Sequence, residues 1–168
     1  SSTRRGEAIA ERPNRTFVVL ALGRSGTHGL ASLRWQVAGA TVHHEPHPYD
    51  SKLIWLRHSG GCDTAVDGML ETRFDEMLGD DPPEVYGEVN SYLRYEADWL
   101  KRHFNPHLVF LVRDGRDFVR SAYTRTVYTA HEGQLPITPR NGDPAAAEWA
   151  RSDRFEKLCW YWNHTNSM

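Results

Sequence analysis

Short apolar segments that alternate with helical patterns most constrain the fold of this chain. Thr16–Leu22 and Leu108–Val112 are continuous runs of mainly apolar, partly β-branched residues. Such runs are typical of strands that are buried on both faces of a parallel sheet. Segments with the spacing of amphipathic helices follow both runs, so the sequence predicts an α/β fold in which helices flank a parallel sheet on both faces.

The other elements follow from the same patterns. Strands are also expected at Ala40–His44 and Val85–Val89, and Leu53–Leu56 is either a further strand or one turn of a buried helix. The residues from His131 to Pro144 form a long connection that suits a lid or a substrate loop. Helices are expected over residues 30–39, 63–78, 91–104, 114–128 and 145–166.

Composition places the chain among single-domain globular proteins. Its 168 residues carry 20 Lys and Arg against 22 Asp and Glu, a net charge of −2 that argues against a nucleic-acid partner. No apolar run approaches the ~20 residues of a membrane helix, so no membrane segment is expected. The two cysteines are too few for a disulfide framework or a Cys-rich zinc site. We expect a disordered or tag-like segment over residues 1–14, one domain over residues 15–168, and a cytoplasmic location.

The turn after the first strand is a candidate anion site. Unpaired backbone N–H groups and the helix dipole favour an anion between a strand and a helix N-terminus. The Walker A pattern fits poorly, because Gly26 is its only match and Thr27 stands where lysine is required. An ordinary ATPase or GTPase is therefore disfavoured, while a phosphate loop of another kind and a tight turn without a ligand both stay open. The turn consists of Gly23, Arg24, Ser25, Gly26, Thr27 and His28.

A second polar cluster follows the strand at Leu108–Val112. Arg113 stands at the end of that strand, and Ser121 lies about two helical turns further on. Ligands collect at the carboxyl ends of strands in open α/β sheets, so Arg113 is expected near the Gly23–His28 loop. The paired N–H groups of its guanidinium suit a phosphate there. The alternative is that the charges of residues 113–117 pair only with one another.

Together these two segments resemble the sulfotransferases that use 3′-phosphoadenosine 5′-phosphosulfate (PAPS). The phosphosulfate loop of that family has the pattern [RK]-[ST]-G-[ST]-[ST], and residues 24–28 of this chain read RSGTH. The 3′-phosphate is held in the family by an Arg, often in R-D-P-R-D, and by a Ser on the next helix. Residues 113–117 read RDGRD and Ser121 follows. Residues 155–162 are also similar to a helix of bacterial members.

The resemblance implies a P-loop-NTPase-like sulfotransferase fold that binds PAPS and releases adenosine 3′,5′-bisphosphate (PAP). The loop at Gly23–His28, with Arg113 and Ser121, would bind this cofactor, and Arg24 would also stabilise charge during transfer. His28 replaces the usual Ser or Thr, and Gly115 replaces the usual Pro. The basic segment that completes the family's 3′-phosphate and adenine pocket is absent, so we expect that the domain lacks its C-terminal part.

The acceptor side of the expected site begins with the HHEPH sequence at residues 43–47. Sulfuryl transfer needs a base for the acceptor proton, and the resemblance favours Glu45, with His44 as the alternative. A metal site is disfavoured, because His43 and His44 point to opposite faces of a strand and no helical H-x-x-x-H accompanies them. Histidines that only cap the turn stay a further alternative.

Glu88 and Asn90, at the end of another strand, are candidates for contact with the acceptor. The alternative is that Asn90 or Ser91 serves as a helix N-cap. The aromatic residues near the end of the chain suit either an acceptor pocket or core packing. The sequence thus favours a PAPS-dependent sulfotransferase without a metal that acts on a hydroxyl or amine of a small-molecule or glycan acceptor. The alternatives are a P-loop-like kinase and a non-catalytic nucleotide-binding module.

Overall fold

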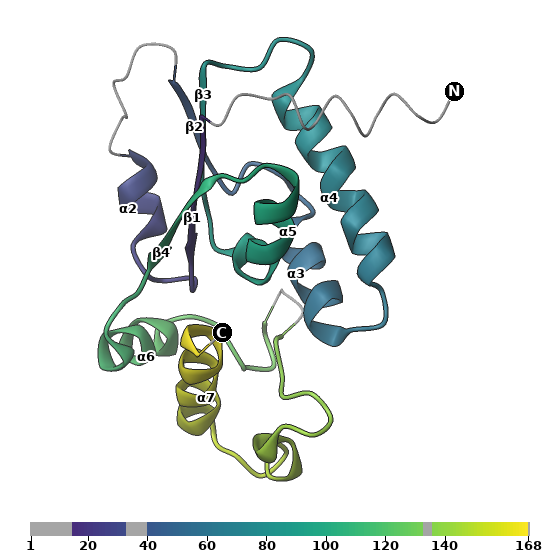
Figure 1. The fold of residues 1–168 in the computed structure, drawn as a ribbon. Coiled ribbons are helices and arrows are strands. Elements are labelled where there is room, and N and C mark those ends of the chain that lie inside the picture. Colours follow the sequence, from purple (N-terminus) through teal and green to yellow (C-terminus); the bar gives the residue numbers. More distant parts are fainter. Residues whose placement is uncertain (1–14, 33–39, 133–135, 168) are drawn as a thin grey trace.

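The computed structural model describes residues 15–32, 40–132 and 136–167, and the N-terminal segment 1–14 lies outside them. Within these residues, four parallel strands form a sheet in the order β2-β3-β1-β4 (Figure 1). Val19 of β1 lies opposite Val89 of β3 and Val109 of β4. All four carboxyl ends therefore meet at one edge of the sheet, and the predicted parallel α/β architecture is confirmed. The strands are β1 (Thr16–Ala21), β2 (Ala40–His44), β3 (Val85–Asn90) and β4 (His107–Leu111).

Helices cover both faces of the sheet. Figure 1 shows α2 (Thr27–Ser32) on one face, and α3 (Asp50–Ser59), α4 (Asp63–Leu78) and α5 (Ala97–His103) on the other. The 3₁₀ turn η1 (Tyr92–Glu96) leads from β3 into α5. Beyond the carboxyl edge of the sheet lie α6 (Gly115–Tyr123) and α7 (Arg154–Asn166), and the 3₁₀ turn η2 (Pro144–Ala147) precedes α7.

Several element boundaries differ from the sequence prediction. The ambiguous segment Leu53–Leu56 is helical and lies in α3, where Leu53 and Ile54 are buried. The helix after β4 ends at Tyr123 instead of continuing to residue 128. The predicted helix over residues 145–166 is interrupted: α7 begins only after Asp153, whose carboxylate accepts the N–H of Glu156 in a capping box.

The prediction that Leu108–Val112 is buried on both faces is wrong. This segment corresponds to β4, which is an edge strand and pairs with β1 alone within the described sheet. Val109 and Phe110 each keep 50% of their surface exposed. An apolar run shows that a strand is favoured, but it does not reveal the position of that strand in the sheet.

Two hydrophobic clusters hold the carboxyl edge in place. The larger lies between the sheet and α3–α5, and includes Leu20, Leu70 and Trp99. The smaller joins the end of β1 to α6 and α7 through Leu22, Phe118 and Leu158, among others. The end of β1 is thus packed on both sides, which fixes the turn that follows it. No helix within the described ranges combines the length and apolar character that crossing a membrane requires.

Candidate functional site

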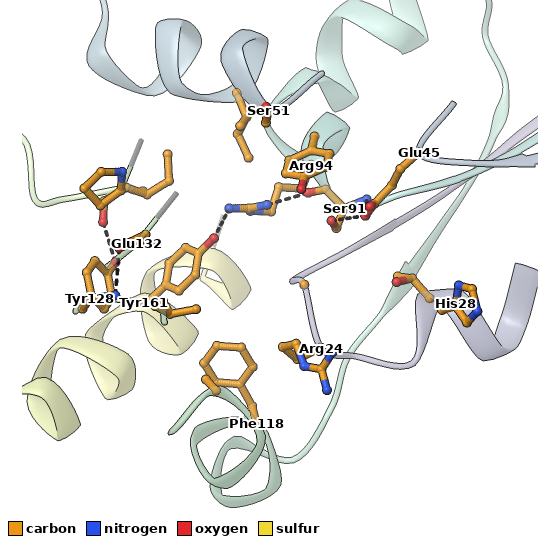
Figure 2. Close-up of a pocket in the computed structure, with 18 of the residues that line it drawn as sticks. Arg24, His28, Glu45, Ser51, Ser91, Arg94, Phe118, Tyr128, Glu132 and Tyr161 are labelled. Carbon is orange, nitrogen blue, oxygen red and sulfur yellow. Dashed lines mark hydrogen bonds between the residues drawn. The ribbon is translucent and has the colours of Figure 1, made fainter. Parts of the chain in front are cut away.

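A cavity of about 320 Å³ opens at the carboxyl edge of the sheet (Figure 2). One wall comes from the loop after β1 and from the ends of β2 and β3, and it carries most of the polar groups. The opposite wall comes from α6, the segment that follows it, and α7. The polar wall contains Arg24, Thr27, His28, His44, Glu45, Ser91 and Arg94, and the facing wall contains Phe118, Ala122, Val127, Tyr128, Ile137 and Tyr161.

The loop after β1 has an unusual backbone. Arg24 has a φ of 73° and Gly26 a φ of 91°, both in the left-handed region. That conformation costs a non-glycine residue about 1–3 kcal/mol, and such strain clusters at functional sites. A Cβ at position 26 would have no atom within 4 Å, so the backbone there borders open space. The loop is held by the Ser25 N–H, which donates to the Leu22 carbonyl at 3.2 Å.

The two segments that the sequence singled out meet in space. Arg24 donates through Nε to Ser121 Oγ at 3.1 Å, and Arg113 donates through Nη1 to the Arg24 carbonyl at 2.7 Å. Trp162 of α7 donates to the Arg113 carbonyl at 2.9 Å and so fixes the backbone at the start of α6. Arg24, Arg113 and Ser121 therefore lie together at the edge of the sheet, although Arg24 is 89 residues from Arg113 and 97 from Ser121 in sequence.

The remaining charges at the start of α6 have a structural role. Asp114 caps the helix and accepts the backbone N–H groups of Arg116 and Asp117. Its side chain also pairs with the Arg116 guanidinium at 3.3 Å, and these hydrogen bonds from Arg116 lower the pKa of Asp114. The self-pairing alternative thus holds for Asp114 and Arg116, whereas Arg113 turns to the loop after β1.

Glu45 and His44 both line the cavity but have different partners. Glu45 has a φ of 44°, and its Oε1 accepts hydrogen bonds from the Ser91 hydroxyl and, at 3.4 Å, from the Ser91 N–H. His44 Nε2 lies 3.2 Å from Thr27 Oγ1, and its ring meets the ring of His28 edge to face. Glu45 is therefore tied to the end of β3, and His44 to the loop after β1.

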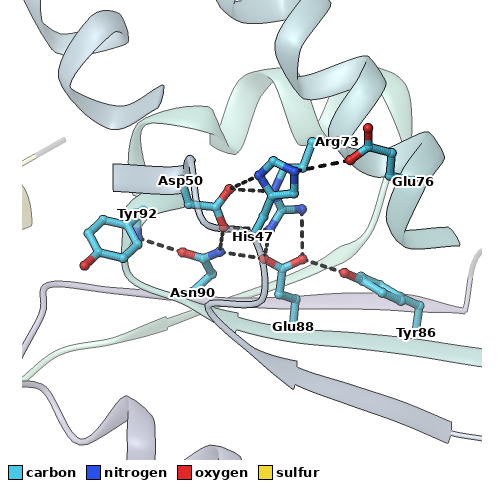
Figure 3. A network of polar contacts seen from close by, with 8 residues as sticks. All are labelled: His47, Asp50, Arg73, Glu76, Tyr86, Glu88, Asn90 and Tyr92. Carbon is cyan, nitrogen blue, oxygen red and sulfur yellow. Dashed lines mark hydrogen bonds and ion pairs between the residues drawn. The ribbon is translucent and has the colours of Figure 1, made fainter. Parts of the chain in front are cut away.

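Glu88 and Asn90 lie behind the cavity. Both are fully buried, and neither lines it. Figure 3 shows them in a network with Asp50 of α3 and Arg73 of α4. The Asn90 amide donates to Asp50 and to Glu88 at 2.6 Å each, while its Oδ1 accepts the N–H of Tyr92 at 2.8 Å. The structure thus gives Asn90 a turn-capping contact and places Glu88 beside an arginine.

Arg73 is the centre of that network. Its guanidinium pairs with Asp50 Oδ1 at 2.7 Å and with Glu88, which also accepts the Tyr86 hydroxyl at 2.7 Å. Burial and the adjacent Glu88 charge raise the pKa of Tyr86, which keeps that hydroxyl a donor. The network therefore anchors β3 to α3 and α4, and it fixes the strand end from which Ser91 reaches Glu45.

Sequence reasoning missed several residues of the cavity, above all Ser91 and Arg94. Arg94 is 4% exposed, and it donates to the Ser91 carbonyl and to the Tyr161 hydroxyl at 2.5 Å each. Tyr161 stands on α7, so this contact joins residues 67 positions apart. The aromatic helix was the sequence signal for Tyr161, whereas nothing local distinguishes Arg94 from the other arginines.

The long connection after α6 also reaches the cavity. Glu132 and Pro136 line it, on either side of residues 133–135, which lie outside the described residues. Glu132 accepts the Tyr128 N–H at 2.8 Å, and burial raises the pKa of its carboxyl. The connection therefore borders the cavity, and its expected role as a lid or a substrate loop stays a prediction.

Within the described parts of the chain, no group of three or more His, Cys, Asp or Glu side chains is placed to hold a metal ion. His43 packs near Tyr86, with ring centroids 5.7 Å apart, and so diverges from His44. The chain matches no protein-family model and no curated protein.

Proposed function

We propose that this chain is a PAPS-dependent sulfotransferase that moves a sulfuryl group to a hydroxyl or amine of a small acceptor. One observation carries the proposal: Arg24, Arg113 and Ser121 converge beside a cavity that also contains Glu45. Two guanidinium groups and a hydroxyl at one sheet edge suit a cofactor with two separate phosphate groups. The P-loop-like sulfotransferase fold belongs to this proposal.

The charges and the loop backbone suit the phosphate groups of such a cofactor. Neither Arg24 nor Arg113 has an ion pair with a carboxylate in the described part of the chain, so both charges are available to a ligand. The open space at Gly26 allows ligand atoms to approach the loop backbone. Arg24 and the loop N–H groups would hold the 5′-phosphosulfate, and Arg113 with Ser121 would hold the 3′-phosphate.

When bound, PAPS supplies the sulfuryl group: the acceptor atom bonds to sulfur as the bond from sulfur to the 5′-phosphate oxygen breaks, and PAP leaves. Glu45 takes the proton from the acceptor, since its carboxylate lines the cavity and is oriented by Ser91. Arg24 offsets the negative charge that develops on the phosphate oxygens. His44, held by Thr27, is the alternative base.

The first experiment is calorimetry with PAP and with ADP. Tighter binding of PAP is expected, because only PAP carries the 3′-phosphate that Arg113 and Ser121 would hold. Equal affinity for the two nucleotides would overturn this assignment. Transfer of labelled sulfate from PAPS to an acceptor then separates an enzyme from a non-catalytic module, and transfer from ATP would favour the kinase alternative.

Arg113→Ala tests the 3′-phosphate contact directly. Loss of a hydrogen bond to a charged group costs about 1.5–3 kcal/mol, so PAP binding should weaken roughly 10-fold to 100-fold. ADP binding should stay unchanged. Arg116→Ala is the matched control, because Arg116 lies on the same helix start but pairs with Asp114. An equal loss in both variants would contradict the assignment.

A further inference from the structure

Arg94 has unused hydrogen-bonding capacity inside the cavity. It lies in η1, directly after β3, and only 4% of its surface is exposed. Figure 2 shows its guanidinium between Ser91 and Tyr161, to which it donates two hydrogen bonds. Its Nε is buried and has no hydrogen-bond partner. Since a guanidinium carries five N–H groups, most of this capacity is free.

The charge of Arg94 is not neutralised by any carboxylate of the described residues. Its partners are a carbonyl, a hydroxyl and the rings of Tyr95 and Tyr161, with centroids 5.2 and 5.4 Å from the guanidinium carbon. Arg73, the other arginine that is buried among the described residues, differs because it pairs with Asp50 and Glu88, and the half-buried Arg57 pairs with three carboxylates. Burial of a cation without a counter-charge is costly, so a structural role alone explains Arg94 poorly.

The carboxylates of the cavity do not supply that counter-charge. Glu45 accepts hydrogen bonds from Ser91, and Glu132 accepts the backbone N–H of Tyr128. The two other cationic groups that the proposed function uses, Arg24 and Arg113, belong to the loop after β1 and to the start of α6. Arg94 is separate from both, on the element that follows β3.

We propose that Arg94 binds a carboxylate on the acceptor, and that the acceptor is a small molecule with an apolar or aromatic body. This inference rests on the proposed function, because it names the substrate class of the same cavity. A guanidinium and a carboxylate form paired, charge-assisted hydrogen bonds. Phe118, Ile137 and Tyr128 line the facing wall and suit an apolar body, and the volume of about 320 Å³ fits a compact molecule.

The test compares two probes of the same shape, para-hydroxyphenylpropionate and its neutral amide, by calorimetry with and without PAP. The carboxylate should bind at least about 10-fold more tightly than the amide, as expected for a charge-assisted hydrogen bond. Arg94→Gln should abolish this preference and leave binding of the amide and of PAP unchanged. Arg94→Lys should keep part of it, and Arg116→Gln, at an exposed arginine, should keep all of it.

Equal binding of the two probes, no binding of the carboxylate, or an undiminished preference in Arg94→Gln would each overturn the proposal. If Arg94→Gln does not fold, as judged by circular dichroism, the wild-type comparison and Arg94→Lys decide. Weaker binding of PAPS relative to PAP in Arg94→Gln, with the carboxylate preference intact, would assign Arg94 to the sulfuryl group instead. Failure of PAP to bind would defeat the proposed function, whereas the carboxylate preference reports on Arg94 alone.

Discussion

Arg73 and Arg94 are both buried arginines that contact the same end of β3, yet their surroundings are opposite. Arg73 reaches Glu88 and Asp50, and its charge is neutralised inside the protein. Arg94 reaches the Ser91 carbonyl on the cavity side and has no carboxylate partner in the described residues. The difference separates a charge that holds the fold together from a charge that is available to a ligand.

The largest expected effect comes from Glu45, whose carboxylate accepts a hydrogen bond from Ser91 at this strand end. Glu45→Gln should lower the rate of sulfuryl transfer by about 10²–10⁴-fold, the usual contribution of a general base. PAP affinity should be unchanged, because Glu45 is not among the groups that hold the cofactor. The measurement is a steady-state assay with labelled PAPS, with Glu71→Gln, at an exposed position of α4, as control. Full turnover in Glu45→Gln would show that Glu45 is not the base and would favour His44.

Replacement of each arginine by methionine compares the two buried charges directly. Arg73→Met leaves Asp50 and Glu88 buried without their counter-charge, which should lower the free energy of unfolding by about 3–5 kcal/mol. Arg94→Met leaves no buried carboxylate without a partner, so it should lower the free energy of unfolding by less. Urea denaturation followed by circular dichroism measures both. An equal decrease in the free energy of unfolding in both variants would show that the two buried arginines do not differ in their contribution to stability.

A change of pH extends the comparison to basic groups that can lose their charge. His58 is buried and donates to the Thr138 carbonyl at 2.6 Å, and burial lowers the pKa of its imidazole. The unfolded chain takes up a proton near pH 6.5, and the folded chain only at lower pH. The stability contributed by neutral His58 is therefore complete above about pH 6.5 and is lost as the pH falls.

The check on this smallest effect is the slope of unfolding free energy against pH between about 7 and 5. His58→Gln keeps a donor for the Thr138 carbonyl but does not titrate, so its slope should be shallower than that of the wild type. His131→Gln serves as the control, because His131 is exposed. Burial also lowers the pKa of His164, so part of the slope should persist in His58→Gln. An unchanged slope would exclude His58 as its source.

The sequence predicted those parts of the site that depend on local patterns. An apolar strand followed by a glycine-containing turn located the loop after β1, and the rule that parallel strands end at one edge placed Arg113 beside it. The role of Ser121 followed only from the resemblance to the sulfotransferases. The sequence also indicated that Glu45 follows the second strand of the sheet, which brings it to the same edge.

Contacts between elements that are distant in sequence could not be predicted from the sequence. Arg94 donates to Tyr161 on α7, and the ion-pair partner of Glu88 is Arg73 on α4. No local sequence pattern therefore predicts which partner each of these two buried side chains has. The exposure of β4 depends on its place at the edge of the sheet, which apolar composition does not encode. The start of α7 at Arg154 does have a local sequence signal, since Asp153 and Glu156 have the capping-box spacing.

The left-handed backbone of Arg24 has a consequence for protein engineering. Glycine adopts a φ of 73° without strain, so Arg24→Gly should be tolerated by the fold better than Arg24→Ala. The same replacement removes a guanidinium that the proposed function needs. A selection for thermal stability should therefore favour glycine at this position, whereas a selection for the proposed sulfuryl transfer should retain arginine.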